Sequence, residues 1–321
     1  MYTTESIIYA ILLAFTVNVI LCPLIIPVLR RLKFGQNVRD DGPQSHLIKS
    51  GTPTMGGVMI VLAFGAAALP YIFNGNHDAK AVLLITIGYG IVGFIDDYLK
   101  IVKKQSEGLT PMQKIIFQLA VTACFAYYIY TCTDLGTGII IPFINKEIEL
   151  GWYLYIPFLF FVMVGTVNSV NLTDGLDGLA AGVTALVATF FMIAAYGSES
   201  GLSPICGAII GSLLGFLLFN SHPAKVFMGD TGSLALGGFV ASTAVLLKMP
   251  LMLLIVGFIY VCESISVILQ VGYFKLTHGK RIFKMAPIHH HFEQCGLKET
   301  KVVALFYIIT AIMCLIGYLA L

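Results

Sequence analysis

The sequence predicts an all-α polytopic membrane protein with ten transmembrane helices and both termini external. Three observations predict this fold class. Of the 321 residues, 58% are hydrophobic and 11% are charged, whereas soluble domains carry about 25% charged residues. Ten apolar runs follow one another along the chain, and many approach the length of about 20 residues that crosses a bilayer. The basic residues gather in alternate loops between these runs.

One boundary between the runs needs an argument, because residues 234–272 are nearly continuous and are broken only at Lys248-Met249-Pro250. As a single helix this stretch would measure roughly 58 Å, against a hydrocarbon core of about 30 Å. We therefore expect two spans joined by a very short turn. The ten runs cover residues 7–29, 55–73, 79–95, 115–130, 153–167, 179–196, 204–219, 234–247, 249–272 and 302–321.

The basic residues predict the orientation of the runs. Counted from the N-terminus, the odd-numbered loops hold 16 of the 19 Lys and Arg residues, and only Lys80, Lys146 and Lys248 lie in the even-numbered loops. The positive-inside rule makes the odd loops cytoplasmic and both termini external. Merging the eighth and ninth runs would place the six basic residues of the last loop outside. We expect a single integral-membrane domain over residues 1–321.

Polar clusters lie at the ends of these runs, all on the predicted cytoplasmic side. The longest is residues 168–178, Asn-Ser-Val-Asn-Leu-Thr-Asp-Gly-Leu-Asp-Gly, between two spans. Acidic residues at a membrane are costly and mark functional sites by default. The convergence predicts one site at the cytoplasmic membrane surface. The other clusters are Asp96-Asp97, Asp230 within Phe-Met-Gly-Asp-Thr-Gly-Ser, His289-His290-His291, and Lys49 with residues 51–54.

The residue types favour Mg²⁺ bound together with a phosphorylated substrate. Carboxylate ligands and nearby lysines suit such a site, and no cluster has the thiolates or the H-E-x-x-H spacing of a zinc site. The loop around Asp174 and Asp177 lacks the later glutamate of a calcium loop. Adjacent aspartates on a helix point about 100° apart. We therefore expect one of Asp96 and Asp97 to act on substrate and the other to hold a lysine or the metal.

Other features have a structural interpretation. The G-x-G-x-x-G match at residues 88–93 lies inside an apolar run, so it indicates helix packing and not dinucleotide binding. Gly207, Gly211 and Gly215 also indicate close helix packing. Residues 134–151 predict a small external hairpin, and residues 273–301 are long enough for a short interfacial helix. Glu263 lies inside the ninth run, where we expect it to face protein, and it is assigned no role.

Taken together, the motifs resemble the phospho-N-acetylmuramoyl-pentapeptide transferase (MraY) family of bacterial cell-wall synthesis, within the polyprenyl-phosphate N-acetylhexosamine-1-phosphate transferase superfamily. The resemblance covers essentially the whole chain. Two of the segments favour the muramoyl-pentapeptide branch: residues 51–57, Gly-Thr-Pro-Thr-Met-Gly-Gly, and residues 289–293, His-His-His-Phe-Glu. The motifs are residues 51–57, Asp96-Asp97, residues 168–178, residues 227–233, and residues 286–293.

The resemblance implies a role for each matched residue. Asp230 resembles the Mg²⁺ ligand, Asp96 and Asp97 resemble the catalytic pair, and His289 resembles an essential histidine. Phe227 resembles a residue that stacks on the uracil base. The remaining candidate substrate-binding residues are Lys49, Thr54, Lys114, Asn171, Asp174, Gly175, Leu176, Asp177, Gly229, His290 and His291.

The implied reaction is transfer of phospho-MurNAc-pentapeptide from UDP-MurNAc-pentapeptide to undecaprenyl phosphate in the bacterial inner membrane, giving lipid I and UMP. The implied cofactor is Mg²⁺. The implied partners are the two substrates and the bilayer, without nucleic acid, and the resemblance is compatible with a homodimer. A sibling transferase that uses UDP-N-acetylglucosamine is one alternative. An ion-coupled transporter is the other, although transporter sites usually lie near the bilayer midplane, whereas these acids lie at span ends.

Overall fold

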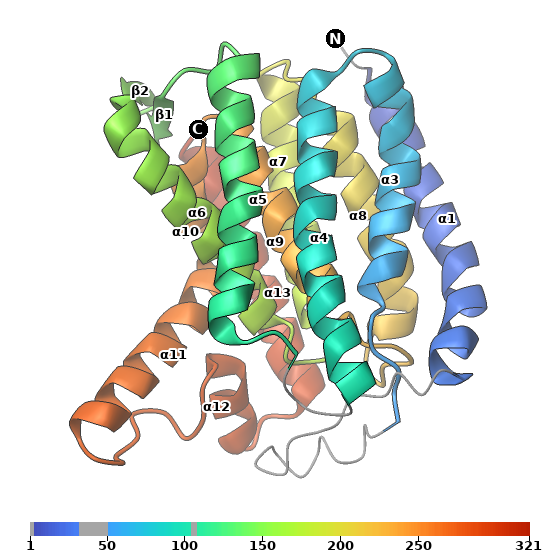
Figure 1. The fold of residues 1–321 in the computed structure, drawn as a ribbon, viewed down its shortest axis with the longest axis vertical. Coiled ribbons are helices and arrows are strands. Elements are labelled where there is room, and N and C mark those ends of the chain that lie inside the picture. The colour runs from blue at the N-terminus through green and yellow to red at the C-terminus, as the bar shows by residue number, and fades with distance from the viewer. Residues whose placement is uncertain (1–2, 32–50, 104–107) are drawn as a thin grey trace.

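A computed structural model describes residues 3–31, 51–103 and 108–321 as a helical bundle with one small hairpin (Figure 1). Each of the ten predicted apolar runs corresponds to a helix or, in one case, to two successive helices. The elements are α1 (Thr4–Arg31), α3 (Gly57–Phe73), α4 (His77–Lys103), α5 (Pro111–Cys132), β1 (Gly138–Ile141), β2 (Lys146–Glu149), α6 (Trp152–Thr173), α7 (Leu179–Gly197), α8 (Ser203–Asn220), α9 (Gly229–Leu246), a 3₁₀ turn (Pro250–Met252), α10 (Leu253–Val256), α11 (Phe258–Leu276), α12 (Ile288–Gln294) and α13 (Glu299–Leu319).

The helices support the prediction of an all-α polytopic membrane protein. Within the described part of the chain, eight helices are long and apolar enough to cross a bilayer, and α3 is a shorter apolar helix of 17 residues. Helix α9 has 18 residues and is continuous, but glycine, serine and threonine interrupt its apolar sequence. The eight long helices are α1, α4, α5, α6, α7, α8, α11 and α13.

Helix α9 forms the centre of the bundle. All of its residues from Thr231 to Leu246 are buried, and α3, α4, α6 and α7 pack against it. Its small residues allow this close approach, because helices in a membrane associate by van der Waals packing between backbones. A Cβ atom added at Gly237 would meet the backbone of Val167 on α6, and one added at Gly238 would meet the ring of Tyr89 on α4.

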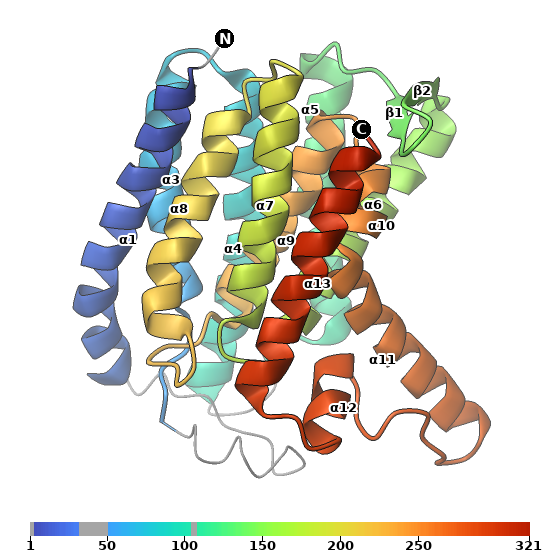
Figure 2. The ribbon, with the colours of Figure 1, turned by 180° about the vertical axis from the view of Figure 1, so that it is seen from behind.

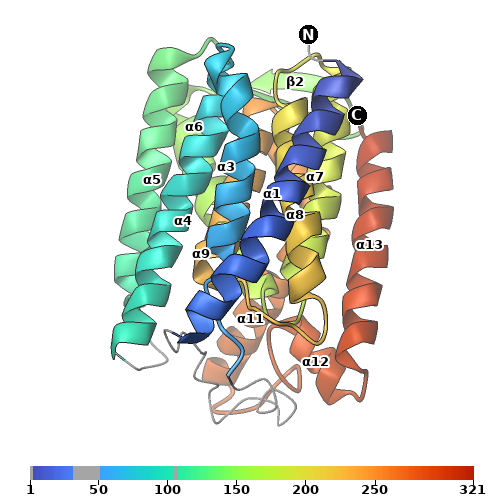
Figure 3. The same ribbon diagram turned by 90° about the vertical axis from the view of Figure 1, so that its right-hand side faces the viewer.

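The glycine patterns are helix-packing sites, as predicted. In the G-x-G-x-x-G segment, Gly93 lies directly against the backbone of Asp230 and Thr231 at the start of α9. On α8, Gly211 lies against the backbone of Ile11, and Gly207 and Gly215 also face α1. Figure 3 shows α1 and α8 crossing side by side.

The segment after α9 confirms a break and adds a second one. Helix α9 ends at Leu246, and Lys248 adopts a positive φ of 57° before the turn at Pro250. The predicted ninth run is then divided at Gly257 into α10 and α11. Gly257 has a φ of −91°, and a Cβ there would meet the Leu253 carbonyl oxygen at 2.6 Å, so close packing favours glycine at this break. Helix α11 leans away from the bundle (Figures 1 and 2), with several exposed apolar side chains along it: Ile265, Ile268, Leu269, Val271 and Leu276.

The two ends of the bundle differ in character. One end holds the hairpin, the start of α1 and the end of α13, and the opposite end holds α12 and the start of α9 (Figures 1 and 2). The hairpin is antiparallel, with Gly138 opposite Glu149, and α12 is the short helix expected in the last long loop. The polar clusters of the described residues lie at the α12 end.

The contact between Gly93 and Asp230 predicts that a larger residue at position 93 destabilises the protein. Gly93→Ala places a methyl group against the α9 backbone, and such overpacking costs about 1–3 kcal/mol. We expect a lower Tm in detergent and a lower turnover. Gly165→Ala on α6 is the control, because a Cβ there meets no atom within 4 Å and alanine favours a helix by about 0.5–1 kcal/mol. Equal Tm values for the two variants would contradict the packing argument.

Candidate active site

Three carboxylates from two helices meet at the α12 end of the bundle. Asp96 and Asp97 lie near the end of α4, and Asp230 lies in the first turn of α9. Their side chains offer oxygen atoms that all lie within 4.8 Å of one another. This spacing is short enough for a single divalent cation to contact more than one of them, and carboxylate oxygens are the ligands that Mg²⁺ prefers.

The two neighbouring aspartates of α4 have different hydrogen-bond partners. Asp97 accepts hydrogen bonds on Oδ1 from the Asp230 N–H at 3.1 Å, and on Oδ2 from the Thr231 N–H at 2.9 Å and the Thr231 hydroxyl at 2.7 Å. It therefore satisfies backbone donors at the N-terminus of α9, where negative charge is stabilising. Asp96 instead accepts from the Leu109 N–H at 2.9 Å and pairs with Lys100 at 2.6 Å.

Two lysines complete this cluster. Asp230 Oδ2 lies 2.8 Å from Lys100 Nζ and 2.9 Å from Lys114 Nζ. The predicted residue Lys114 thus comes from the first turn of α5, which begins with a capping box at Thr110. Lys100 was not among the predicted site residues, although its position four residues after Asp96 on one helix face indicated a pair.

The C-terminal end of α6 approaches the cluster from the other side. Asn171 donates from Nδ2 to Asp230 Oδ1 and to Ser233 Oγ, both at 2.8 Å. Asp174 follows at the end of α6 and is hydrogen bonded by the backbone of Gly229. Burial, together with the nearby carboxylates of Asp230 and Asp97, raises the pKa of Asp174 well above its ordinary value.

The donor set fits a divalent cation. Asp230 and Asp96 have oxygen atoms that face lysine ammonium groups, and a cation or a phosphate would change those pairings. Both oxygens of Asp97 are already engaged by α9 donors. Of the three carboxylates, Asp230 and Asp96 therefore keep more capacity to contact a cation, and the Asn171 side chain lies beside Asp230.

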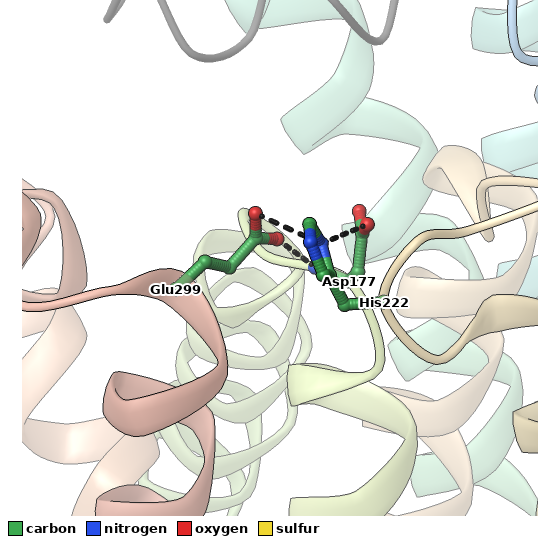
Figure 4. A group of neighbouring side chains, drawn as sticks. All are labelled: Asp177, His222 and Glu299. Atoms are coloured by element: carbon green, nitrogen blue, oxygen red, sulfur yellow. Dashed lines mark hydrogen bonds and ion pairs between the residues drawn. The ribbon is translucent and has the colours of Figure 1, made fainter.

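A second polar group holds the same loop at its other end (Figure 4). His222 Nδ1 lies 3.1 Å from Asp177 Oδ2 and 3.4 Å from Glu299 Oε2. The Asp177 N–H also donates to Glu299 Oε1 at 2.8 Å. Three elements are thereby joined: the loop before α7, the loop after α8 and the first turn of α13. No spacing in the sequence indicated a role for His222 or Glu299.

Gly229 and Thr54 lie beside Asp97, and the backbone of Phe227, two residues before Gly229, is bonded to the segment that carries Thr54. The Phe227 N–H donates to the Pro53 carbonyl, and its own carbonyl accepts from the Gly56 N–H, both at 2.8 Å. Gly229 adopts a positive φ of 74°, and a Cβ there would meet Asp97 Oδ2 at 2.7 Å and Thr54 Oγ1 at 2.8 Å. A glycine is therefore required at this position. Lys49 lies outside the described residues.

The other predicted residues differ in what they contact. The ring of His289 lies against Gly175 and is fully buried. His290 pairs with Glu293 at 2.8 Å, and His291 accepts from the Lys284 N–H at 3.1 Å within its own loop. Leu176 is buried in the hydrophobic core, so its side chain contributes packing in this structure.

The chain is similar to known proteins over almost its whole length. A family model described as glycosyl transferase family 4 matches residues 79–248, and a phospho-N-acetylmuramoyl-pentapeptide-transferase signature matches residues 49–61. The transferase of that name from Clostridium perfringens (strain 13 / Type A) is 54% identical over 317 residues, covering 98% of this chain and 99% of the relative. That of Clostridium novyi (strain NT) is 51% identical over 315 residues, covering 98% and 96%.

The chain belongs to the phospho-N-acetylmuramoyl-pentapeptide transferase family. Its signature segment holds Lys49 and Thr54, and the glycosyl transferase match spans Asp96, Asp97 and Asp230. The match to the general family model ends before Glu263 and the three histidines. Those residues are covered instead by the full-length similarity to the muramoyl-pentapeptide transferases.

The raised pKa of Asp174 predicts a pH-dependent stability. The folded protein holds the proton of this carboxyl more tightly than the unfolded chain does. The stability that this tighter-held proton contributes is therefore fully present below the pKa of Asp174 in the unfolded chain. It is lost as pH rises through the pKa of Asp174 in the folded protein. Without divalent cations we expect Asp174→Asn to have a higher Tm than the wild type at pH 7 and an equal Tm near pH 4. Thermal unfolding in detergent measures this difference, and a lower Tm for the variant at pH 7 would contradict it.

Proposed function

We propose that this chain transfers phospho-MurNAc-pentapeptide from UDP-MurNAc-pentapeptide to undecaprenyl phosphate, releasing UMP and forming lipid I. The observation that carries the proposal is the joint cluster of three aspartates and two lysines at one end of the bundle. The relatives that share more than half of its residues are named for this transfer.

The proposal includes a membrane arrangement. The chain crosses the bacterial plasma membrane ten times, as a single transferase domain with both termini external and the aspartate cluster at the cytoplasmic surface. The uneven distribution of lysine and arginine among the loops supports this orientation. It also suits the chemistry, because one substrate is soluble and the other lies in the inner leaflet.

The reaction requires two anionic phosphates to approach each other. An oxygen of the lipid phosphate attacks the β-phosphorus of the nucleotide sugar, the bond from that phosphorus to the bridging oxygen breaks, and UMP leaves with the bridging oxygen. Lys100 and Lys114 can offset the charge on these groups. Asp96, which accepts from the Leu109 N–H and lies beside Lys100 and Asp230, is the residue we assign to orient the lipid phosphate or to accept its proton in a direct attack.

The cofactor of the proposal is Mg²⁺. Asp230 would be its principal ligand, with Asp96 and Asn171 beside it, and the ion would neutralise charge on the diphosphate when bound. Phe227 and the loop from Asn171 to Asp177 would hold the uridine side. Aromatic stacking on a base contributes about 1–3 kcal/mol.

Asp230, in the first turn of α9, and Asp97, which bonds to that turn, predict a contrast between variants. Asp230→Asn should lower the rate of UMP release at least tenfold, which corresponds to about 1.4 kcal/mol, with little change in Tm. Asp97→Asn should lower Tm as well as rate, because one of its two acceptor oxygens becomes an amide that faces α9 donors. A hydrogen bond to a charged group contributes about 1.5–3 kcal/mol.

The assay supplies UDP-MurNAc-pentapeptide and undecaprenyl phosphate to the purified wild type and the two variants. Release of UMP only when UDP-N-acetylglucosamine replaces the muramoyl substrate would favour the sibling transferase. An Asp230→Asn variant that keeps more than a tenth of the wild-type rate would remove Asp230 as the principal metal ligand.

A further inference from the structure

Glu263 is the single acidic residue of α11, and its side chain is completely buried. The helix that carries it leans away from the bundle and exposes many apolar side chains. A carboxylate inside a membrane helix is costly and calls for a functional explanation. Neither the aspartate cluster nor the Asp177 group includes it.

The partner of Glu263 is His289, from the first turn of α12. Glu263 Oε1 lies 3.0 Å from His289 Nδ1, and both side chains are at most 1% exposed. Among the described residues, neither carboxylate oxygen of Glu263 and neither ring nitrogen of His289 makes a hydrogen bond, so the 3.0 Å contact between Oε1 and Nδ1 is close without being aligned as one. Apolar residues of similar size often stabilise a protein as well as a buried pair does, so stability alone does not explain this one.

The other ring nitrogen of His289 points to the candidate substrate loop. A Cβ atom added at Gly175 would overlap Nε2, so the imidazole edge lies directly against the backbone at Gly175. This glycine follows Asp174 and lies two residues before Asp177. The ring is therefore placed between the carboxylate of α11 and the loop that contacts the aspartate cluster.

We propose that Glu263 is a positioning residue for His289, a role that rests on the proposed transferase function. Its carboxylate lies against Nδ1 and favours the proton on that nitrogen, so that Nε2 is the atom presented toward the Gly175 loop and the substrate bound there. Carboxylates fix the tautomer and orientation of histidine in this way in catalytic triads and metal sites. The observation that distinguishes this arrangement from a packing contact is the 3.0 Å approach of the buried carboxylate to Nδ1 while Nε2 lies against Gly175.

Glu263 is joined to the rest of the site through its own helix. Ser264 donates to Ser169 Oγ on α6 at 2.6 Å, which ties α11 to the helix that carries Asn171 and Asp174. Gln270 accepts from the N–H groups of Ile282 and Phe283 at 3.1 and 2.9 Å. The loop leading to α12 is thus bound to α11, which keeps His289 within reach of Glu263.

The test compares kcat, KM and Tm in the UMP-release assay for Glu263→Ala, Glu263→Gln, His289→Ala and Glu263→Ala/His289→Ala. We expect Glu263→Ala to lower kcat at least tenfold with KM for UDP-MurNAc-pentapeptide within about threefold of wild type. Glu263→Gln should recover part of this loss, because its amide oxygen can still accept Nδ1–H. The double variant should be no slower than His289→Ala, because the two residues act as one unit.

The control is Ser266→Ala, which removes a buried hydroxyl that donates to the Glu263 carbonyl and should leave kcat unchanged. A kcat for Glu263→Ala within threefold of wild type would overturn the proposal, as would losses that multiply in the double variant. If Glu263→Ala does not fold, the same comparison is made with Glu263→Gln and Glu263→Gln/His289→Ala, and multiplying losses would again overturn it. A wild type that releases no UMP would instead refute the proposed function.

Discussion

The bonds from Asp97 to the start of α9 are the interaction on which the rest of the site depends. One carboxylate satisfies two backbone N–H groups and the Thr231 hydroxyl, and Gly93 allows the two helices to touch at the same level. This contact places Asp230 beside Asp96 and between two lysines. Without these bonds, packing between α4 and α9 alone would have to hold the register that brings the carboxylates together.

The site has two parts that are joined by one loop. At one end of the loop, Asn171 and Asp174 contact the aspartate cluster, and at the other end Asp177 is held by His222 and by Glu299 of α13. Tyr307 of α13 also donates to the Gly178 carbonyl at 2.7 Å. Helices from both halves of the chain thus fix a short segment rich in glycine. Such an arrangement suits an enzyme that must hold a nucleotide and a diphosphate at fixed separation.

The sequence was sufficient to predict the helices and to place the clusters at one end of the bundle, because apolar length and charge placement are local properties. It also predicted that Asp96 and Asp97 would differ, since helix geometry separates adjacent side chains. It could not assign Asp97 to α9, because that requires knowing which helices touch. His222 and Glu299 were missed because they reach Asp177 from distant elements. Glu263 could be expected to face protein, but its partner His289 depends on the fold between them.

The measurement that tests the account most directly is isotope exchange. The proposed reaction breaks one phosphoanhydride and makes another, so its equilibrium constant should lie near unity and the enzyme should run it in both directions. With Mg²⁺ and lipid I present, labelled UMP should enter UDP-MurNAc-pentapeptide, and Asp230→Asn should abolish the exchange. Exchange that strictly requires the lipid supports direct attack, whereas exchange without any lipid would indicate a covalent intermediate on Asp96 or Asp97. Absence of exchange in the wild type under conditions where UMP is released would contradict the central claim.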